Sequence, residues 1–244
     1  MAIRPGACEA DRRRLSQQFH GIALDKEVLY GLAELARKSK CHLLVDEAYA
    51  SLTYDEHAAR VPSAASLGPQ VVVVSSMSKV YGVPGIRIGW LCTTDAQLQL
   101  KFLAAKEQMC IGGSVLDDSL IAEQILARSD VLLRETRQDM QNRLSYVEAW
   151  VERQNGMVEW VHPQAGVMGL MRVRSDPRCV DGDAKQSVCD LCAQLLAEHG
   201  VYVGPRRCFE REEAIYFRLG SGWPMWYALE AGLKGIAKGL RSKQ

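Results

Sequence analysis

The chain has no long hydrophobic run and no excess of charge of either sign. None of its apolar stretches approaches the roughly 20 residues that a membrane-spanning helix needs, and its first residues, MAIRPGACEADRRRL, carry charges with no apolar segment behind them. Thirty Lys and Arg residues nearly balance 29 Asp and Glu residues, which leaves a net charge of +1. The charge balance therefore gives no indication of nucleic acid or an anionic membrane surface as a partner. We expect a cytoplasmic protein with no nucleic acid and no membrane as partner.

The eight cysteines are too sparse for a disulfide scaffold in a chain of 244 residues. Cys189 and Cys192 form a CxxC pair, which could belong to a redox or zinc site, but no second CxxC and no HxxxH accompanies it. A site that also used His199 would lack a fourth ligand. The spacing of the pair, three residues apart in VCDLCAQLLAEHG, favours two thiols on the apolar side of a helix, and we predict no metal site.

The composition is that of an ordinary globular protein, with 48% hydrophobic and 24% charged residues. A length of 244 residues suits one large domain or about one and a half domains of roughly 150 residues. Residues 1–20 are Arg-rich and without periodicity, so they are expected to form an irregular leader.

An α/β pattern begins after this leader. Asp25 is a plausible N-cap, and a stripe of apolar residues behind it predicts a helix buried on one face. Short runs of aliphatic residues follow at 43–45 and 71–74, and another strand is predicted over 86–92. Such continuous apolar runs are typical of parallel strands that are covered on both faces.

The pattern changes near Asn155-Gly156. Before it, helices are predicted over 96–110, 116–127 and 130–154; after it, strands over 157–161, 166–173 and 214–219 alternate with helices over 184–199 and from Pro224 to about 240. We therefore expect a partial large domain with a mostly parallel sheet and helices on both faces, at residues 21–154. A smaller α+β domain would occupy residues 155–244.

The stretch SSMSKVYGVPGIRIGW, residues 75–90, is the most informative in the chain. It places Lys79 just after a buried strand, where α/β sheets bind ligands. A partly desolvated amine at such a position can lose its proton and attack a carbonyl. A solvated loop lysine is the alternative on Lys79 alone.

The surrounding pattern, Ser-x-x-Lys followed by Gly-x-Pro-Gly-x-Arg-x-Gly-Trp, resembles the pyridoxal-phosphate (PLP) attachment site of the class I/II aminotransferases of fold type I. Asp46-Glu47-Ala48-Tyr49, which begins 33 residues before Lys79, resembles the Asp-x-x-Tyr motif of the same family. The resemblance covers about residues 21–240. It implies a PLP-transferase large domain, followed by a small C-terminal domain.

The resemblance implies roles for seven residues. Lys79 would form the Schiff base with PLP and move the substrate's proton, Asp46 would face the pyridine nitrogen, and Tyr49 would donate to the phenolic oxygen. The remaining four residues would bind anionic groups: Ser76 and Arg87 the phosphate, Arg218 in the strand-like IYFRL the substrate carboxylate, and Ser78 either the phosphate or nothing, as a small residue that the turn requires.

The sequence departs from the family at several positions. Gly21 matches the end of an Asn-Pro-x-Gly turn, but Gln18 stands where the Asn is expected, and Ala165 replaces the first Gly of a Pro-x-Gly-Gly motif. Residues 1–20 supply neither the family's glycine-containing phosphate loop nor its ring-stacking aromatic residue. The sheet is therefore expected to lack several strands.

The leading hypothesis is a PLP-dependent aminotransferase, which moves an amino group from an amino acid to a 2-oxo acid and, by resemblance, works as a homodimer. A lyase, a decarboxylase or a cyclising synthase would use the same residues, so the sequence leaves these open. A truncated, non-catalytic family member that cannot hold the cofactor is the alternative from another class.

Overall fold

The computed structural model describes residues 26–54, 62–174, 181–205, 216–222 and 225–241. The leader predicted over residues 1–20, which includes Gln18, lies outside the described residues. So do Gly21, Asp25 and Pro224. None of the helices in these ranges is long and apolar enough to cross a membrane.

The first sheet has the strand order β1-β2-β3, and its strands are β1 (Leu43–Asp46), β2 (Val71–Ser76) and β3 (Gly89–Cys92). β1 and β2 run parallel, as predicted, and β3 is antiparallel to β2. The strand predicted over residues 86–92 begins only at Gly89, because Pro84–Ile86 form the short 3₁₀ helix η4. Pro fixes φ near −65° and offers no N–H, which favours a helical turn there over a ladder.

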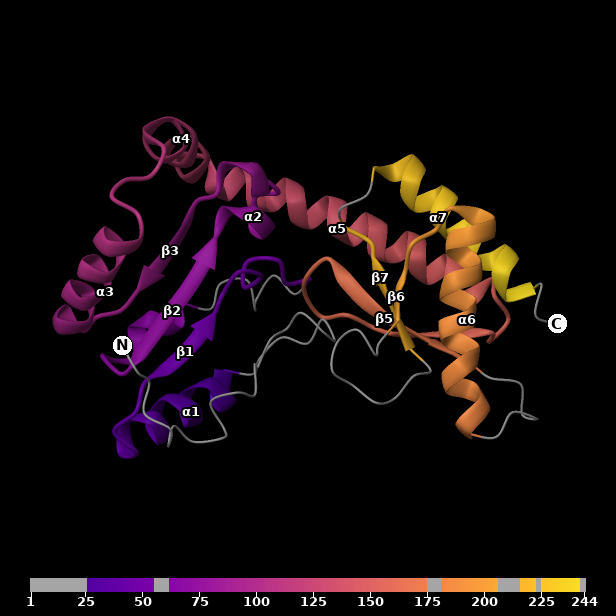
Figure 1. Cartoon of the computed structure of the whole chain (residues 1–244), viewed down its shortest axis with the longest axis horizontal. Helices are drawn as coiled ribbons and strands as arrows, with labels where there is room; N and C mark the ends of the chain where they lie inside the picture. Colours follow the sequence, from indigo (N-terminus) through magenta and orange to yellow (C-terminus); the bar gives the residue numbers. More distant parts are fainter. Residues whose placement is uncertain (1–25, 55–61, 175–180, 206–215, 223–224, 242–244) are drawn as a thin grey trace.

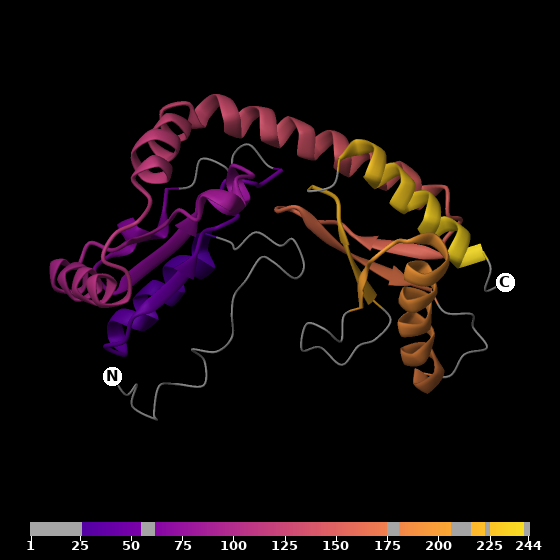
Figure 2. The same cartoon turned by 45° about the horizontal axis from the view of Figure 1, so that its top comes forward.

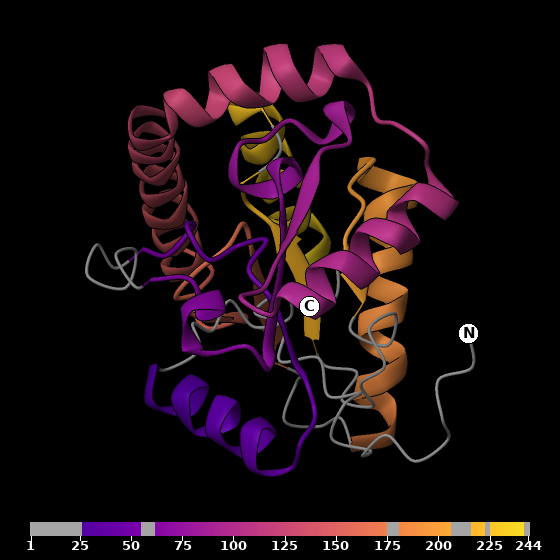
Figure 3. The same ribbon diagram turned by 90° about the vertical axis from the view of Figure 1, so that its left-hand side faces the viewer.

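Helix α1 (Lys26–Lys38) covers one part of this sheet, next to the 3₁₀ helix η3 (Ala64–Leu67). Its buried Ala33 packs in a cluster with Val71 and Val73 of β2. Leu44, which points to the other face of β1, is 65% exposed, although the sequence predicted cover on both faces. α1 and α3 (Ala96–Met109) flank the strands on different sides (Figure 3).

A long helix, α5 (Ser129–Glu152), runs from the first sheet to the second (Figures 1 and 2). It follows the helical turns η5 (Leu116–Ala122) and α4 (Glu123–Ala127), which together occupy the helix predicted over residues 116–127. Apolar residues recur along α5 at helical spacing, and three of them, Met140, Leu144 and Val147, are buried. α5 therefore packs one face along both halves of the molecule.

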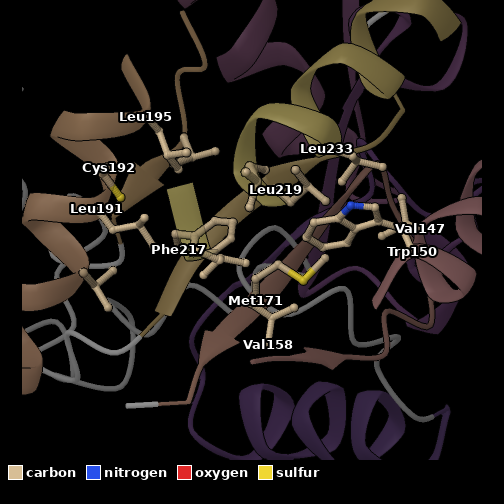
Figure 4. Packing of buried hydrophobic residues seen from close by; sticks show 14 of the residues in the cluster. Val147, Trp150, Val158, Met171, Leu191, Cys192, Leu195, Phe217, Leu219 and Leu233 are labelled. Atoms are coloured by element: carbon tan, nitrogen blue, oxygen red, sulfur yellow. The ribbon is translucent and has the colours of Figure 1, made fainter. Parts of the chain in front are cut away.

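The second sheet is antiparallel, with the order β4-β5-β7-β6. Its strands are β4 (Val158–Val161), β5 (Met168–Val173), β6 (Gly204–Pro205) and β7 (Tyr216–Gly220). Helices α6 (Asp181–His199) and α7 (Trp226–Arg241) pack beside it, and Figure 4 shows how Phe217, Met171 and Trp150 meet in the shared core. The two sheets agree with a partial α/β fold, and we retain residues 21–154 and 155–244 as the proposed domains.

Cys192 lies in this core, 8% exposed, whereas Cys189 is half-buried on the same helix. Cys192 therefore behaves as a small hydrophobic residue, as its helical spacing predicted. Within the described ranges, no group of three or more His, Cys, Asp or Glu side chains is placed to hold a metal ion.

Candidate active site

The carboxyl ends of β1 and β2 meet at one edge of the first sheet, because the two strands are parallel. Asp46, the last residue of β1, pairs with Val74 in the register of β2. β2 ends two residues later at Ser76, and the short helix α2 (Met77–Val80) then carries Lys79. The parallel pairing thus brings Asp46 and Lys79 to the same edge of the sheet, where open α/β sheets bind ligands.

Lys79 lines a pocket of about 400 Å³ between the two halves of the molecule. The first half contributes Lys79 with Leu52, Tyr81 and Gly82; the remaining lining residues come from α5 and the second half: Glu135, Thr136, Asp139, Met140, Val167 and Gly222. The other six predicted site residues are not among the residues that line this pocket. The predicted catalytic lysine therefore borders a cavity and does not stand in a solvated loop.

The Asp46 carboxylate is held by its own turn. Its Oδ1 accepts a hydrogen bond from the backbone N–H of Ala48 at 2.9 Å. The neighbouring Glu47 is used structurally, since its Oε1 accepts from the N–H of Ala64 at 2.7 Å and its carbonyl accepts from the Ser75 hydroxyl at 3.2 Å. Asp46 is exposed, so its second carboxylate oxygen can accept a hydrogen bond from a ligand.

Tyr49 lies between the two halves and is only 5% exposed. Burial raises the pKa of its hydroxyl; the positive charge of Arg218 lowers this pKa and the negative charge of Asp46 raises it. Both charges therefore act on the phenol. Because Arg218 stands in the middle of β7, the second sheet contributes to this site as well.

Arg87 lies just past the β2–β3 ladder, in which Ser76 pairs with Gly89. Its backbone has a left-handed φ of +53°, and its Nη1 donates to the carbonyl of Pro84 at 2.7 Å. The side chain is exposed, so its guanidinium binds its own loop here rather than joining the other site residues. Ser76 and Ser78 are half-buried on either side of the strand end.

Sequence reasoning missed the residues that tie this region together. The hydroxyl of Tyr54 donates to the carbonyl of Gly166 at 2.6 Å, and the Arg143 side chain is buried between α5 and the end of β7. Both contacts join residues more than 70 positions apart. The one local signal was the aromatic residue five places after Tyr49.

Comparison with protein families gives a match to "Aminotransferase class I and II" over residues 20–221. Capreomycidine synthase from Streptomyces vinaceus is 28% identical over 220 residues, which are 90% of this chain and 52% of that protein. Aspartate aminotransferase from Thermotoga maritima is 25% identical over 191 residues, 78% of this chain and 45% of that protein. The chain thus spans about half the length of these relatives.

Solved structures give the same result. A PLP-dependent aminotransferase from Streptococcus suis 89-1591 superposes with a TM-score of 0.79 and 29% identity, over 93% of this chain and 55% of that one. The PLP-dependent cyclase OrfR superposes with a TM-score of 0.77 and 25% identity, over 93% of this chain and 57% of that one. Because the family match covers most of the sequence and the fold agrees, the chain belongs to the family of class I and II aminotransferases.

Proposed function

We propose that the chain is a PLP-dependent aminotransferase that acts in the cytoplasm and transfers an amino group from an amino acid to a 2-oxo acid. The observation that supports it most is the position of Lys79. This lysine follows the central strand of the first sheet, lines the pocket between the two halves, and shares a sheet edge with Asp46. Membership of the family makes PLP the cofactor that this arrangement suits.

The donor set fits the four polar groups of PLP. The aldehyde needs an amine, and the pyridine nitrogen needs a carboxylate. The phenolic oxygen needs a hydroxyl donor, and the phosphate needs donors from hydroxyl and guanidinium groups. Lys79, Asp46 and Tyr49 match the first three groups. Ser76, Ser78 and Arg87 match the phosphate, and Arg87 would exchange its bond to Pro84 for one to the phosphate.

When bound, PLP supplies a ring that withdraws the negative charge left at the α-carbon of the amino acid. Lys79 would attach the cofactor through its amine and carry the proton that leaves the α-carbon. Asp46 would keep the pyridine nitrogen protonated, and Tyr49 would hold the phenolic oxygen. Arg218 would orient the α-carboxylate by a charged, bidentate pair.

An amine-transfer assay with a panel of 2-oxo acids tests this proposal. The wild-type chain should transfer amine stoichiometrically and the Lys79→Ala variant should transfer none. Lys101→Ala, an exposed lysine of α3, is the matched control and should retain activity. Bound PLP without any amine transfer would refute the aminotransferase assignment.

A cyclising synthase is the second candidate, because capreomycidine synthase and the cyclase OrfR are among the similar proteins. Mass spectrometry of the same reactions separates the two, since cyclisation leaves the amino acid's nitrogen in the product.

We also propose a homodimer. Light scattering should give twice the mass of the chain, and a monomer would contradict it.

A further inference from the structure

The loop that follows Tyr49 is fixed to the second half of the molecule by a set of buried contacts, which we call the loop clamp. The clamp consists of residues 51–54 and 164–166. Thr53 forms an antiparallel bridge with Ala165, the N–H of Tyr54 donates to the Gln164 carbonyl at 3.0 Å, and the N–H of Gly166 donates to the Leu52 carbonyl at 2.8 Å. Leu52, Thr53 and Ala165 are all buried.

The Tyr54 hydroxyl completes the clamp. It donates to the Gly166 carbonyl at 2.6 Å, so both polar groups of this glycine bind the loop. Burial raises the pKa of Tyr54 from 10.0 to about 12, so the hydroxyl remains a donor in moderately alkaline solution as well. Helix α5 supports the same loop, since Nε of Arg137 donates to the Ser51 carbonyl at 2.9 Å and Nε2 of Gln141 to the Tyr54 carbonyl at 3.3 Å.

Gly166 lies beside the Tyr49 ring, which packs in one buried cluster with Leu52 of the clamp and with Val167. The φ of Gly166 is +86°, a left-handed value that favours glycine, and a methyl group added there would lie 3.8 Å from Cδ1 of Tyr49. The next residue, Val167, accepts hydrogen bonds at its carbonyl from the N–H groups of Ser221 and Gly222, at 3.0 and 3.1 Å. These two residues directly follow β7, the strand that carries Arg218.

We propose that Tyr54 is a positioning residue. Through its hydrogen bond to Gly166 it holds the Tyr49 ring against the second sheet, and it thereby sets the place of the Tyr49 hydroxyl relative to Arg218. The use of this placement in catalysis rests on the function proposed above, in which Tyr49 contacts the cofactor and Arg218 the substrate. The placement itself is a property of the chain without cofactor.

The pKa of Tyr49 in the cofactor-free chain tests the placement. NMR of chain labelled with ¹³C at the tyrosine Cζ reports this pKa, with the resonance assigned by Tyr49→Phe. In Tyr54→Phe, water should reach the phenol and its pKa should fall towards the ordinary tyrosine value, because burial is the largest cause that raises it. Tyr202→Phe makes the same change at a side chain that is 79% exposed, and it should leave the Tyr49 pKa at the wild-type value.

A purely structural role for Tyr54 gives a different result: the melting temperature falls while the Tyr49 pKa stays at the wild-type value, which would overturn the proposal. Arg137→Gln loosens the same loop from α5 and serves as the second variant should Tyr54→Phe not fold. It should lower the Tyr49 pKa in the same direction. An unchanged pKa in every folded variant refutes the proposal.

The cofactor-loaded enzyme gives an independent readout. Tyr54→Phe should raise the KM for the amino acid about 3- to 10-fold, the loss expected from one weakened hydrogen bond, and kcat should change less. In a Tyr49→Phe background the same substitution should have a smaller effect, since the two residues act together. Failure of the wild-type chain to bind PLP would refute the proposed function, while the NMR titration would still decide the role of Tyr54.

Discussion

The guanidinium of Arg143 lies over the indole ring of Trp226, with its central carbon 4.8 Å from the ring centroid. Its Nε also pairs with Oδ2 of Asp139 at 2.6 Å, and its Nη1 donates to the Ser221 carbonyl at 3.2 Å. The indole N–H of Trp226 donates to Oδ1 of Asp139 at 3.2 Å, which closes the cluster. Four residues thereby join α5 to the end of β7 and the start of α7.

Arg143→Ala should lower the free energy of unfolding by about 2–4 kcal/mol, because it removes a charged hydrogen bond and a cation–π contact from a site where the arginine is only 7% exposed. Urea denaturation at pH 7 measures the change. Arg134→Ala, at an exposed position on the same helix, is the control and should stay within about 0.5 kcal/mol of the wild type. Equal losses in the two variants would show that the cluster contributes nothing.

Tyr54 should make the chain sensitive to alkaline pH. Its pKa is about 12 in the folded chain, raised by burial from 10.0, so above pH 10 the unfolded chain releases this proton first. The contribution is therefore complete below pH 10 and is lost as pH rises towards 12. Urea titrations at pH 9, 10 and 11 should show a smaller decline in stability for Tyr54→Phe than for the wild type. Parallel declines would contradict the assigned pKa.

Gly222 lies where a side chain has no room. A Cβ atom there would stand 2.6 Å from Cβ of Val167 and 2.8 Å from Sδ of Met140. Gly222→Ala should therefore destabilise the fold by about 1–3 kcal/mol through overpacking. Gly232→Ala in α7, which has no atom within 4 Å of the added methyl, should instead stabilise by roughly 0.5–1 kcal/mol. Thermal unfolding of both variants tests the difference in sign.

The cysteine pair of α6 should behave as part of the packing. Cys192→Ser places a hydroxyl in the core and should cost about 1–3 kcal/mol, whereas Cys189→Ser at the half-buried position should cost less. Added zinc should change the unfolding midpoint of neither the wild type nor the variants. A zinc-dependent rise of that midpoint, lost in both variants, would revive the metal site.

The sequence predicted the elements whose signals are local. The aliphatic runs before Asp46 and before Ser76 are the strands β1 and β2, and the apolar stripe through Met140 and Val147 is the long helix α5. The motif around Lys79 correctly placed this residue just after a buried strand, although the structure has the short helix α2 there instead of a loop. Each of these follows from residues that are neighbours in the chain or one helical turn apart.

The features that the sequence did not predict depend on distant pairings. The bond between Tyr54 and Gly166 spans 112 positions, and the two-residue strand β6 exists only because β7 pairs with it. The direction of the Arg87 guanidinium follows from a left-handed backbone turn and the carbonyl of Pro84, which a motif does not specify. The catalytic and binding roles of the seven site residues remain predictions.

Borohydride reduction after mixing the chain with PLP, followed by peptide mapping with mass spectrometry, tests the central claim most directly. We predict that the reduced cofactor is attached to the peptide that contains Lys79 and that the Lys79→Ala variant carries none. Attachment only at exposed lysines such as Lys101 or Lys106, or no attachment at all, would contradict the assignment of Lys79 as the residue that binds the cofactor.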